Sequence, residues 1–199
     1  QTSKSLGLTK WLCSSSKLKK RIIKKLLPKS PHLSLKNNMK IISIDPGYER
    51  LGIAILEKIS KGKTFGREVL VFSECFKTSS KLPHSERLTL IGNRIREIIK
   101  KYKPEALATE KLFFSGNQKT AMKVSESRGV ILYTGSSLGL EVFEYTPNDV
   151  KIAITGYGRS EKRQMIDMVK KLIIVTSKTN SDDEFDAIAI GLTHLAIHR

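Results

Sequence analysis

The sequence has few cysteines, no long apolar run and, over its first fifth, no acidic residue. Its two cysteines, Cys13 and Cys75, have the spacing of neither a metal site nor a disulfide framework, so we expect a reducing compartment. No segment approaches the roughly 18 consecutive apolar residues of a membrane-spanning helix. The longest apolar-rich stretch, residues 187–197, is interrupted by glycine, threonine and histidine. The sequence therefore predicts a globular protein with no membrane partner.

Charge of one sign dominates the composition. The chain has 36 Lys and Arg against 19 Asp and Glu, which gives a formal net charge of +17. A surface of this kind attracts polyanions, and nucleic acid is the leading candidate. An anionic membrane surface and a plain solvated basic surface are the alternatives that charge alone leaves open.

The basic residues are unevenly distributed along the chain. Residues 1–38 contain ten Lys or Arg and no acid, whereas residues 39–199 contain 26 basic and 19 acidic residues. We therefore expect a basic, disordered extension over 1–38 and one compact domain over 39–199. The extension has three interpretations: a nucleic-acid-binding arm, an organelle-targeting presequence or a segment without a role. We favour an unstructured arm or a segment without a role, and a cytoplasmic, nucleoid-associated protein.

The domain shows the pattern of a mixed α/β protein. Helix periodicity is clearest in residues 85–101, where Leu88, Ile91, Ile95 and Ile98 follow each other at spacings of three and four. Three expected strands come first, and later strands alternate with helices, which predicts a mixed sheet with helices on its faces. The expected strands are residues 40–44, 51–56, 68–76, 106–109 and 140–145, and the expected helices are residues 85–101, 118–137, 162–174 and 183–198.

Two acidic residues stand at the ends of expected strands. Asp45 follows the first strand and precedes Pro-Gly, and Glu110 ends a small, apolar strand. The carboxyl ends of strands in an open α/β sheet are where ligand sites form. The alternatives are a turn in which Asp45 caps its own backbone and an ion pair between Glu110 and Lys111.

A second acidic group opens the last expected helix. Asp182 is a suitable N-cap, and acids in a first helical turn are favoured by the helix dipole, which would account for the group without any site. Asp183 and Asp186 are three residues apart, so they share one side of the helix, and we expect this side to face the sheet edge. Four converging carboxylates would suit Mg²⁺, which prefers hard oxygen ligands and open positions for water.

Three acidic segments together resemble a known family. Residues 44–47 (Ile-Asp-Pro-Gly), 110–114 (Glu-Lys-Leu-Phe-Phe) and 183–187 (Asp-Glu-Phe-Asp-Ala) resemble, in order, the acidic motifs of the RuvC-family Holliday junction resolvases. Residues 128–130, 144–147 and 155–158 also resemble the family. The resemblance runs from about residue 39 to the end, and residues 1–38 have no counterpart in it.

The resemblance implies a fold, an activity and partners. The fold is ribonuclease H-like, a mixed five-stranded sheet flanked by helices, and the activity is paired nicking of a four-way DNA junction with Mg²⁺ or Mn²⁺. The implied partners are the junction DNA, a second copy of the chain and a branch-migration helicase complex. By position, Asp45, Glu110, Asp183 and Asp186 match the catalytic and metal-binding acids of the family.

The resemblance also implies contacts with DNA. Phe113 matches an aromatic residue that stacks on junction bases, although core packing beside the next phenylalanine is the alternative. Lys151 and Lys162 match basic DNA contacts, and Lys162 is expected to open a helix, a suitable position for a phosphate. Arg128 and Arg159 are weaker candidates, because any single basic residue is more often a solvated surface group.

Two positions depart from the family pattern. Phe185 stands where a small residue is usual, which puts the packing beside the acidic pair in question, and Ser127 replaces a common alanine. His194 is expected to be structural. Two other functions remain open: a nuclease of the same fold that acts on another structured nucleic acid, such as precursor ribosomal RNA, and a basic nucleic-acid-binding protein without catalysis.

Overall fold

The structure is a computed structural model that describes residues 38–59, 67–112, 118–175 and 181–198. The basic extension expected over residues 1–38 lies outside these ranges, except for its last residue, which begins the first strand. Within the described ranges, no helix combines the length and apolarity that crossing a bilayer requires.

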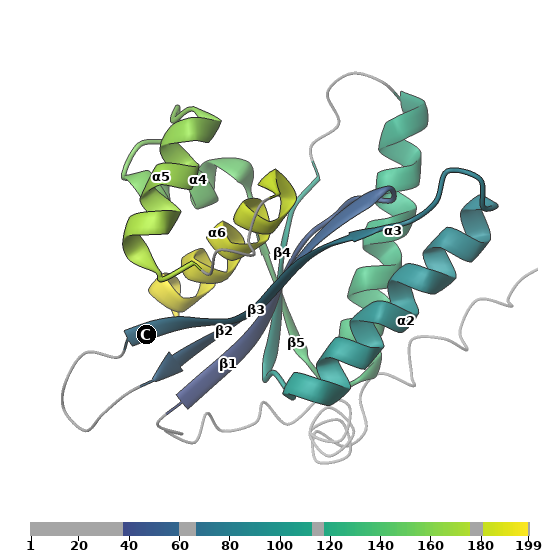
Figure 1. Cartoon of the computed structure of the whole chain (residues 1–199), viewed down its shortest axis with the longest axis horizontal. Coiled ribbons are helices and arrows are strands. Elements are labelled where there is room, and N and C mark those ends of the chain that lie inside the picture. The colour runs from purple at the N-terminus through teal and green to yellow at the C-terminus, as the bar shows by residue number, and fades with distance from the viewer. Residues whose placement is uncertain (1–37, 60–66, 113–117, 176–180, 199) are drawn as a thin grey trace, which may run out of the picture. The chain divides into compact units, whose positions relative to one another are not determined.

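A five-stranded sheet forms the centre of the fold (Figure 1). The spatial order is β3-β2-β1-β4-β5, in which β1, β2 and β3 are antiparallel neighbours, and β4 runs parallel to both β1 and β5. The predicted mixed sheet is therefore confirmed. The strands are β1 (Asn38–Asp45), β2 (Arg50–Ile59), β3 (Arg67–Lys77), β4 (Ala106–Glu110) and β5 (Glu141–Tyr145).

Helices cover both faces of the sheet. In Figure 1, α2 and α3 lie on one face, and α4, α5 and α6 lie on the other. The helices are α2 (His84–Tyr102), α3 (Gln118–Ser137), α4 (Pro147–Thr155), α5 (Lys162–Leu172) and α6 (Asp182–Ile197). This is the three-layer arrangement that strands alternating with helices predict.

Side-chain alternation in the strands builds two cores. Along β1, Ile41 packs with residues of α5 and α6, whereas Ile42 and Ile44 pack with residues of α2 and α3. Successive side chains of a strand point to opposite faces, so a strand covered on both faces must be apolar at every position. This alternation also fixes the side of Asp45, which follows Ile44 and therefore lies on the α6 face of the sheet.

Helix α4 was not among the expected elements. Its N-cap is Thr146, whose hydroxyl accepts a hydrogen bond from the Asp149 amide, and the Asp149 carboxylate accepts one from the Thr146 amide. Pro147 occupies the first turn, where its missing N–H costs nothing. The Thr-Pro-Asn-Asp segment has the residue types and spacing of a capping box, so the helix was predictable from the sequence.

Helix α6 is the most buried helix of the domain and starts above the sheet edge. Its N-cap is Ser181 and not Asp182, because the Ser181 hydroxyl accepts from the Glu184 amide. The first turn of α6 lies directly on β2: a Cβ built on Gly52 would come within 2.0 Å of the Asp183 carbonyl oxygen. Glycine at position 52 therefore sets how closely α6 can approach the sheet.

Gly52→Ala should lower the free energy of unfolding by about 1–3 kcal/mol, because the added methyl group would push against helix backbone. Chemical denaturation of the purified chain measures this. Gly129→Ala is the matched control, since a Cβ at that helical position meets nothing within 4 Å. It should be neutral or stabilising by about 0.5–1 kcal/mol. Equal stability of the two variants would mean that α6 does not depend on Gly52.

Candidate active site

Asp45 and Glu110 end two neighbouring parallel strands at the same level. Ile44 of β1 is in register with Thr109 of β4, so the next residues, Asp45 and Glu110, stand side by side. Both strands run in one direction, and both acids fall on the face that α6 covers. The prediction that strand-end acids meet at one edge is therefore consistent with the topology.

Helix α6 brings two more carboxylates to this edge. Asp183 and Asp186 lie in its first turns, close enough to raise the pKa of Asp45 by charge repulsion. Glu184 lies between them in the sequence and is buried, with its carboxylate 2.7 Å from the Ser73 hydroxyl of β3. This hydrogen bond ties the start of α6 to β3.

The strand-end acids have strongly perturbed ionisation. Burial raises the pKa of Asp45 from 3.8 to about 8, and the charges of Asp186, Glu110 and Asp183 add to the effect. Burial and the charge of Asp186 raise the pKa of Glu110 from 4.5 to about 6. Ionised carboxylates in such a place need a nearby cation.

Lys162 provides one cation from α5. Its Nζ lies 2.6 Å from Asp186 Oδ2 and 3.8 Å from Asp182 Oδ2. Burial raises the pKa of Asp186, although the hydrogen bond from Lys162 works against it. Lys151 of α4 is also near enough for its charge to lower the pKa of Glu110. Two lysines predicted to contact DNA therefore lie beside the acids.

Arg50 provides the other cation from the start of β2. Its Nε and Nη2 lie 2.8 and 2.6 Å from Asp183 Oδ2. The Cys75 thiol of β3 and the Ser181 hydroxyl donate to the same oxygen, at 3.3 and 3.2 Å. Burial acts to raise the pKa of Asp183, but the hydrogen bonds from Arg50 and Cys75 outweigh it, so this pKa is lowered.

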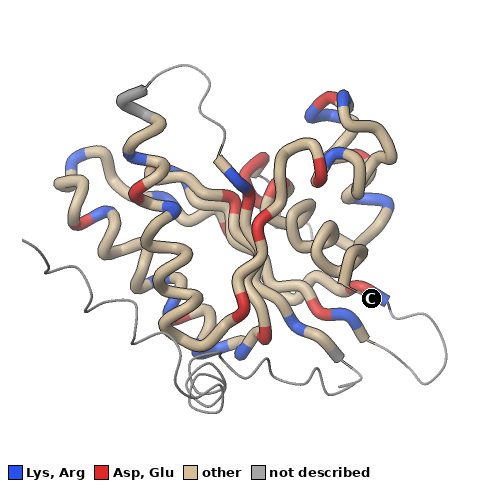
Figure 2. Tube along the Cα trace, turned by 180° about the vertical axis from the view of Figure 1, so that it is seen from behind, with Lys and Arg blue, Asp and Glu red and all other residues tan. Residues whose placement is uncertain are grey.

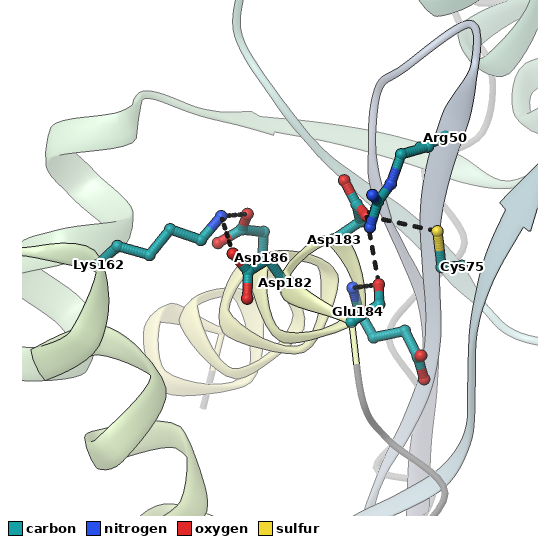
Figure 3. Close-up of polar contacts among 8 residues, drawn as sticks. Arg50, Cys75, Lys162, Asp182, Asp183, Glu184 and Asp186 are labelled. Carbon is teal, nitrogen blue, oxygen red and sulfur yellow. Dashed lines mark hydrogen bonds and ion pairs between the residues drawn. The ribbon is translucent and has the colours of Figure 1, made fainter.

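The two helix acids point in different directions (Figure 3). Asp186 reaches toward Lys162, and Asp183 reaches toward Arg50 and Cys75. As the side chains stand, no three His, Cys, Asp or Glu residues of the described ranges surround a common point that could hold one ion. The donor set nevertheless suits a hard divalent cation: four carboxylates gather here, and burial and mutual repulsion keep three of them from ionising readily.

The remaining predicted DNA contacts differ in their surroundings. Arg159 is exposed in the turn between α4 and α5, whereas Arg128 of α3 is half-buried and forms an ion pair with Glu144. This pair favours a structural role for Arg128. Phe113 lies outside the described residues. Figure 2 shows acidic residues near the strand ends in the middle of the domain, with basic residues on the helices to either side.

Both departures from the family pattern have a physical account. Phe185 is buried in the core beneath α6, with Lys170 Nζ 5.2 Å from its ring centroid, so the ring points away from the acids. The Ser127 hydroxyl donates a hydrogen bond of 3.0 Å to the Gly47 carbonyl. Ser127 thereby ties α3 to the turn that follows Asp45.

Sequence reasoning missed the residues that support the acids. Arg87 is buried, and it donates hydrogen bonds to the Thr78 hydroxyl and the Tyr48 carbonyl, which holds the turn after Asp45. An arginine on the apolar side of a predicted helix was the available signal for Arg87, and a glycine inside a predicted strand was the signal for Gly52. No sequence signal identifies Arg50. His194, expected to be structural, is buried with its Nδ1 2.8 Å from the Tyr145 hydroxyl.

Asp45→Asn should stabilise the metal-free protein, by an amount that grows as pH rises from about 4 to 8. The folded protein keeps the Asp45 proton up to about pH 8, whereas the unfolded chain releases it near pH 3.8, so wild-type stability falls through this window. Asparagine has no proton to lose. We expect a gain on the order of 2–4 kcal/mol at pH 8, measured by denaturation in EDTA.

Asp149→Asn is the control, because here the expected change in stability has the opposite sign. The hydrogen bonds with Thr146 lower the pKa of Asp149, so the ionised group stabilises the fold above its ordinary pKa and this contribution disappears in acid. The variant should therefore lose stability at neutral pH. If Asp45→Asn were also less stable than wild type at pH 8, the destabilising effect of burying an ionised Asp45 among the other acids would be refuted.

Known proteins are similar to this chain in sequence and in fold. The family described as crossover junction endodeoxyribonuclease RuvC matches residues 41–194. A crossover junction endodeoxyribonuclease RuvC of Halothermothrix orenii is 42% identical over 156 residues, which are 78% of this chain and 92% of that protein. A RuvC of Fusobacterium nucleatum is 41% identical over 157 residues, 79% of this chain and 80% of that protein.

Solved structures agree. The Thermus thermophilus RuvC in complex with Holliday junction substrate superposes with a TM-score of 0.73 at 32% identity, covering 81% of this chain and 95% of that chain. A yeast mitochondrial Holliday junction resolvase has a TM-score of 0.56 at 9% identity, covering 79% and 77% of the two chains, which shows the shared fold alone. By sequence and by fold, the chain belongs to the RuvC family of crossover junction endodeoxyribonucleases.

Proposed function

We propose that this protein resolves four-way DNA junctions during recombination and repair by paired, metal-dependent nicks. The observation that carries the proposal is the gathering of four carboxylates from β1, β4 and α6 at one sheet edge, in a chain of the RuvC family. The relative from Thermus thermophilus, whose structure contains Holliday junction substrate, supports the choice of substrate.

Asp45, Glu110, Asp183 and Asp186 are the residues that would hold Mg²⁺ or Mn²⁺. When bound, the metal supplies an activated water and stabilises the leaving oxygen of the phosphodiester. Asp45 and Glu110 come from the ends of two buried strands, so their backbone positions are rigid. Asp186 is paired with a lysine and must exchange this partner for the metal.

The lysines beside the acids are suited to hold the DNA phosphate. Lys162 opens α5, its side chain is half exposed, and its ammonium group already lies at the edge of the acidic cluster. A cation there would orient the scissile phosphate and offset its charge. Lys151 and Arg159 would extend this contact along the strand, and Phe113 would stack on a base at the junction.

Asp45→Asn and Glu110→Gln should each lower the rate of junction cleavage at least a hundredfold, about 2.7 kcal/mol, because each removes a metal ligand. Binding to the junction should survive, since the lost carboxylates repel phosphate. The measurement is single-turnover cleavage of a synthetic mobile four-way junction by the full chain, with and without Mg²⁺.

Asp167→Asn, at an exposed position on α5, is the matched control and should cut at the wild-type rate. Duplex DNA and structured RNA run in parallel to test the substrate. Near-wild-type cutting by Asp45→Asn would refute the catalytic assignment. Preferential cleavage of RNA would favour the alternative substrate, and no cleavage of any nucleic acid in Mg²⁺ or Mn²⁺ would favour a binding protein.

The same proposal includes a homodimer, because paired nicks need two active sites. Helix α3 is the candidate interface, and Met122, Val130 and Leu132 are the apolar residues on it that a second copy could cover. Of these, Met122 is 64% exposed, and Val130 and Leu132 are partly buried within the domain. Tyr133 is 68% exposed and follows Met122 by eleven residues, three helical turns, so the two lie on one outer stripe of α3.

Met122→Lys combined with Tyr133→Lys should convert a dimer into a monomer, because two charges would enter an apolar interface. Sedimentation velocity at micromolar concentration measures the mass of each form. Ile197→Lys, which places one added charge on another exposed apolar residue, on α6, should leave the mass unchanged. A wild-type chain that sediments as a monomer would count against the dimer.

We also infer a cytoplasmic, nucleoid-associated location and an association with a branch-migration helicase complex. The location follows from a DNA substrate. The helicase follows from the family likeness, since resolution requires a junction at a suitable position.

A further inference from the structure

We propose that Arg50 is a positioning residue, which holds one oxygen of Asp183 so that the other oxygen is presented to the metal. This inference rests on the proposed function, because it assigns a role to Arg50 at the same metal site. Arg50 belongs to none of the acidic motifs, and the sequence offers no reason to select it.

The contacts of Asp183 converge on a single atom. Arg50 donates to Oδ2 through both Nε and Nη2, at 2.8 and 2.6 Å, and the Cys75 thiol and Ser181 hydroxyl donate to Oδ2 at 3.3 and 3.2 Å. Within the described part of the chain, no donor reaches Oδ1. One oxygen is thus occupied by the protein, and the other remains available as a ligand.

The donors come from separate, rigid elements. Arg50 begins β2, Cys75 lies in β3 directly opposite Gly52, and Ser181 caps α6. Arg50, Gly52 and Cys75 all fall on the α6 face of the sheet, because residues two apart in a strand share a face and Cys75 is paired with Gly52. The close approach of α6 at Gly52 brings Asp183 within reach of these donors.

The pattern differs from that of the second helix acid in the number and geometry of the donors, since the Arg50 and Lys162 side chains are both about half exposed. Asp186 is held by Lys162 through one nitrogen on a flexible stem, a contact that the metal and a phosphate can replace. Asp183 is held by the planar guanidinium fork and two further donors, which together fix the rotation of the carboxylate. If Arg50 only neutralised Asp183, its contacts would not need to leave Oδ1 of Asp183 without a donor.

Residues that hydrogen-bond to a metal ligand affect how strongly the site binds its metal. Hydrogen bonds to a ligating carboxylate orient it, and losing one typically weakens metal binding or activity by 10- to 100-fold. The electrostatic effect of Arg50 has the opposite sign, because a positive charge near a cation weakens its binding. A variant that removes both therefore reveals which effect dominates.

The test is direct Mn²⁺ binding to the full-length chain, measured by titration calorimetry and by the electron paramagnetic resonance signal of free Mn²⁺. Arg50→Gln should raise the half-saturating Mn²⁺ concentration at least tenfold. Arg50→Lys, which keeps the charge but loses the fork, should bind more weakly than wild type. Because Lys also keeps the repulsion, its loss of affinity isolates the orienting role.

Arg96→Gln on α2 is the matched control, since Arg96 hydrogen-bonds to Asn93 on the opposite face of the sheet. It should bind Mn²⁺ as the wild type does. Thermal unfolding in EDTA checks that each variant folds. If Arg50→Gln fails this check, Arg50→Lys and Cys75→Ala carry the test, and both should weaken Mn²⁺ binding.

Cleavage of the junction provides a second readout. The Mg²⁺ concentration for half-maximal rate should rise for Arg50→Gln in proportion to the Mn²⁺ effect, and excess Mg²⁺ should restore most of the maximal rate. Unchanged or tighter metal binding in the Arg50 variants would overturn the inference. Weaker junction binding in EDTA with unchanged metal affinity would instead make Arg50 a DNA contact.

The wild-type chain separates the two proposals. If it binds no Mn²⁺, the metal-dependent function fails, and the role of Arg50 fails with it. If it binds Mn²⁺ and cuts junctions while the Arg50 variants do the same at equal metal concentrations, only the role of Arg50 is lost.

Discussion

The burial of several like charges together at the end of the central strands is the constraint on which the site depends. Asp45 and Glu110 cannot move apart, because β1 and β4 are paired in register and packed on both faces. Two cations from other elements offset part of this negative charge: Arg50 on β2 and Lys162 on α5. The two cations compensate the helix acids, which leaves the strand acids as the groups that most need a metal.

Much of this arrangement could be predicted because it depends on backbone patterns. A short apolar run ending in Asp45, and another ending in Glu110, predict two buried strands whose carboxyl ends meet. The spacing of Asp183 and Asp186 predicts that both lie on one side of a helix. The divergence of these two side chains was not predictable, because it depends on where Arg50 and Lys162 reach across the folded domain.

The supporting contacts show the same limit of sequence reasoning. Ser127 drew attention only as an unusual residue, and its hydrogen bond to the Gly47 carbonyl depends on how closely α3 approaches the turn after Asp45. The N-cap of α6 was misplaced by one residue, since Ser181 and Asp182 are both good caps and the packing of the helix decides between them. By contrast, α4 was missed although its capping box involves only neighbouring residues and could be recognised in the sequence.

Helix α6 joins the active site to the core in one rigid piece. Its first two turns carry Asp183 and Asp186, and the helix is buried from there as far as Leu195. The helix therefore cannot fray at its first turn without disturbing Glu184 and the apolar side chains behind it. Activity and the folded structure should consequently be lost at the same temperature on heating. A substitution on the buried side of α6 would also shift the acids at its start and lower the activity, although it changes no carboxylate.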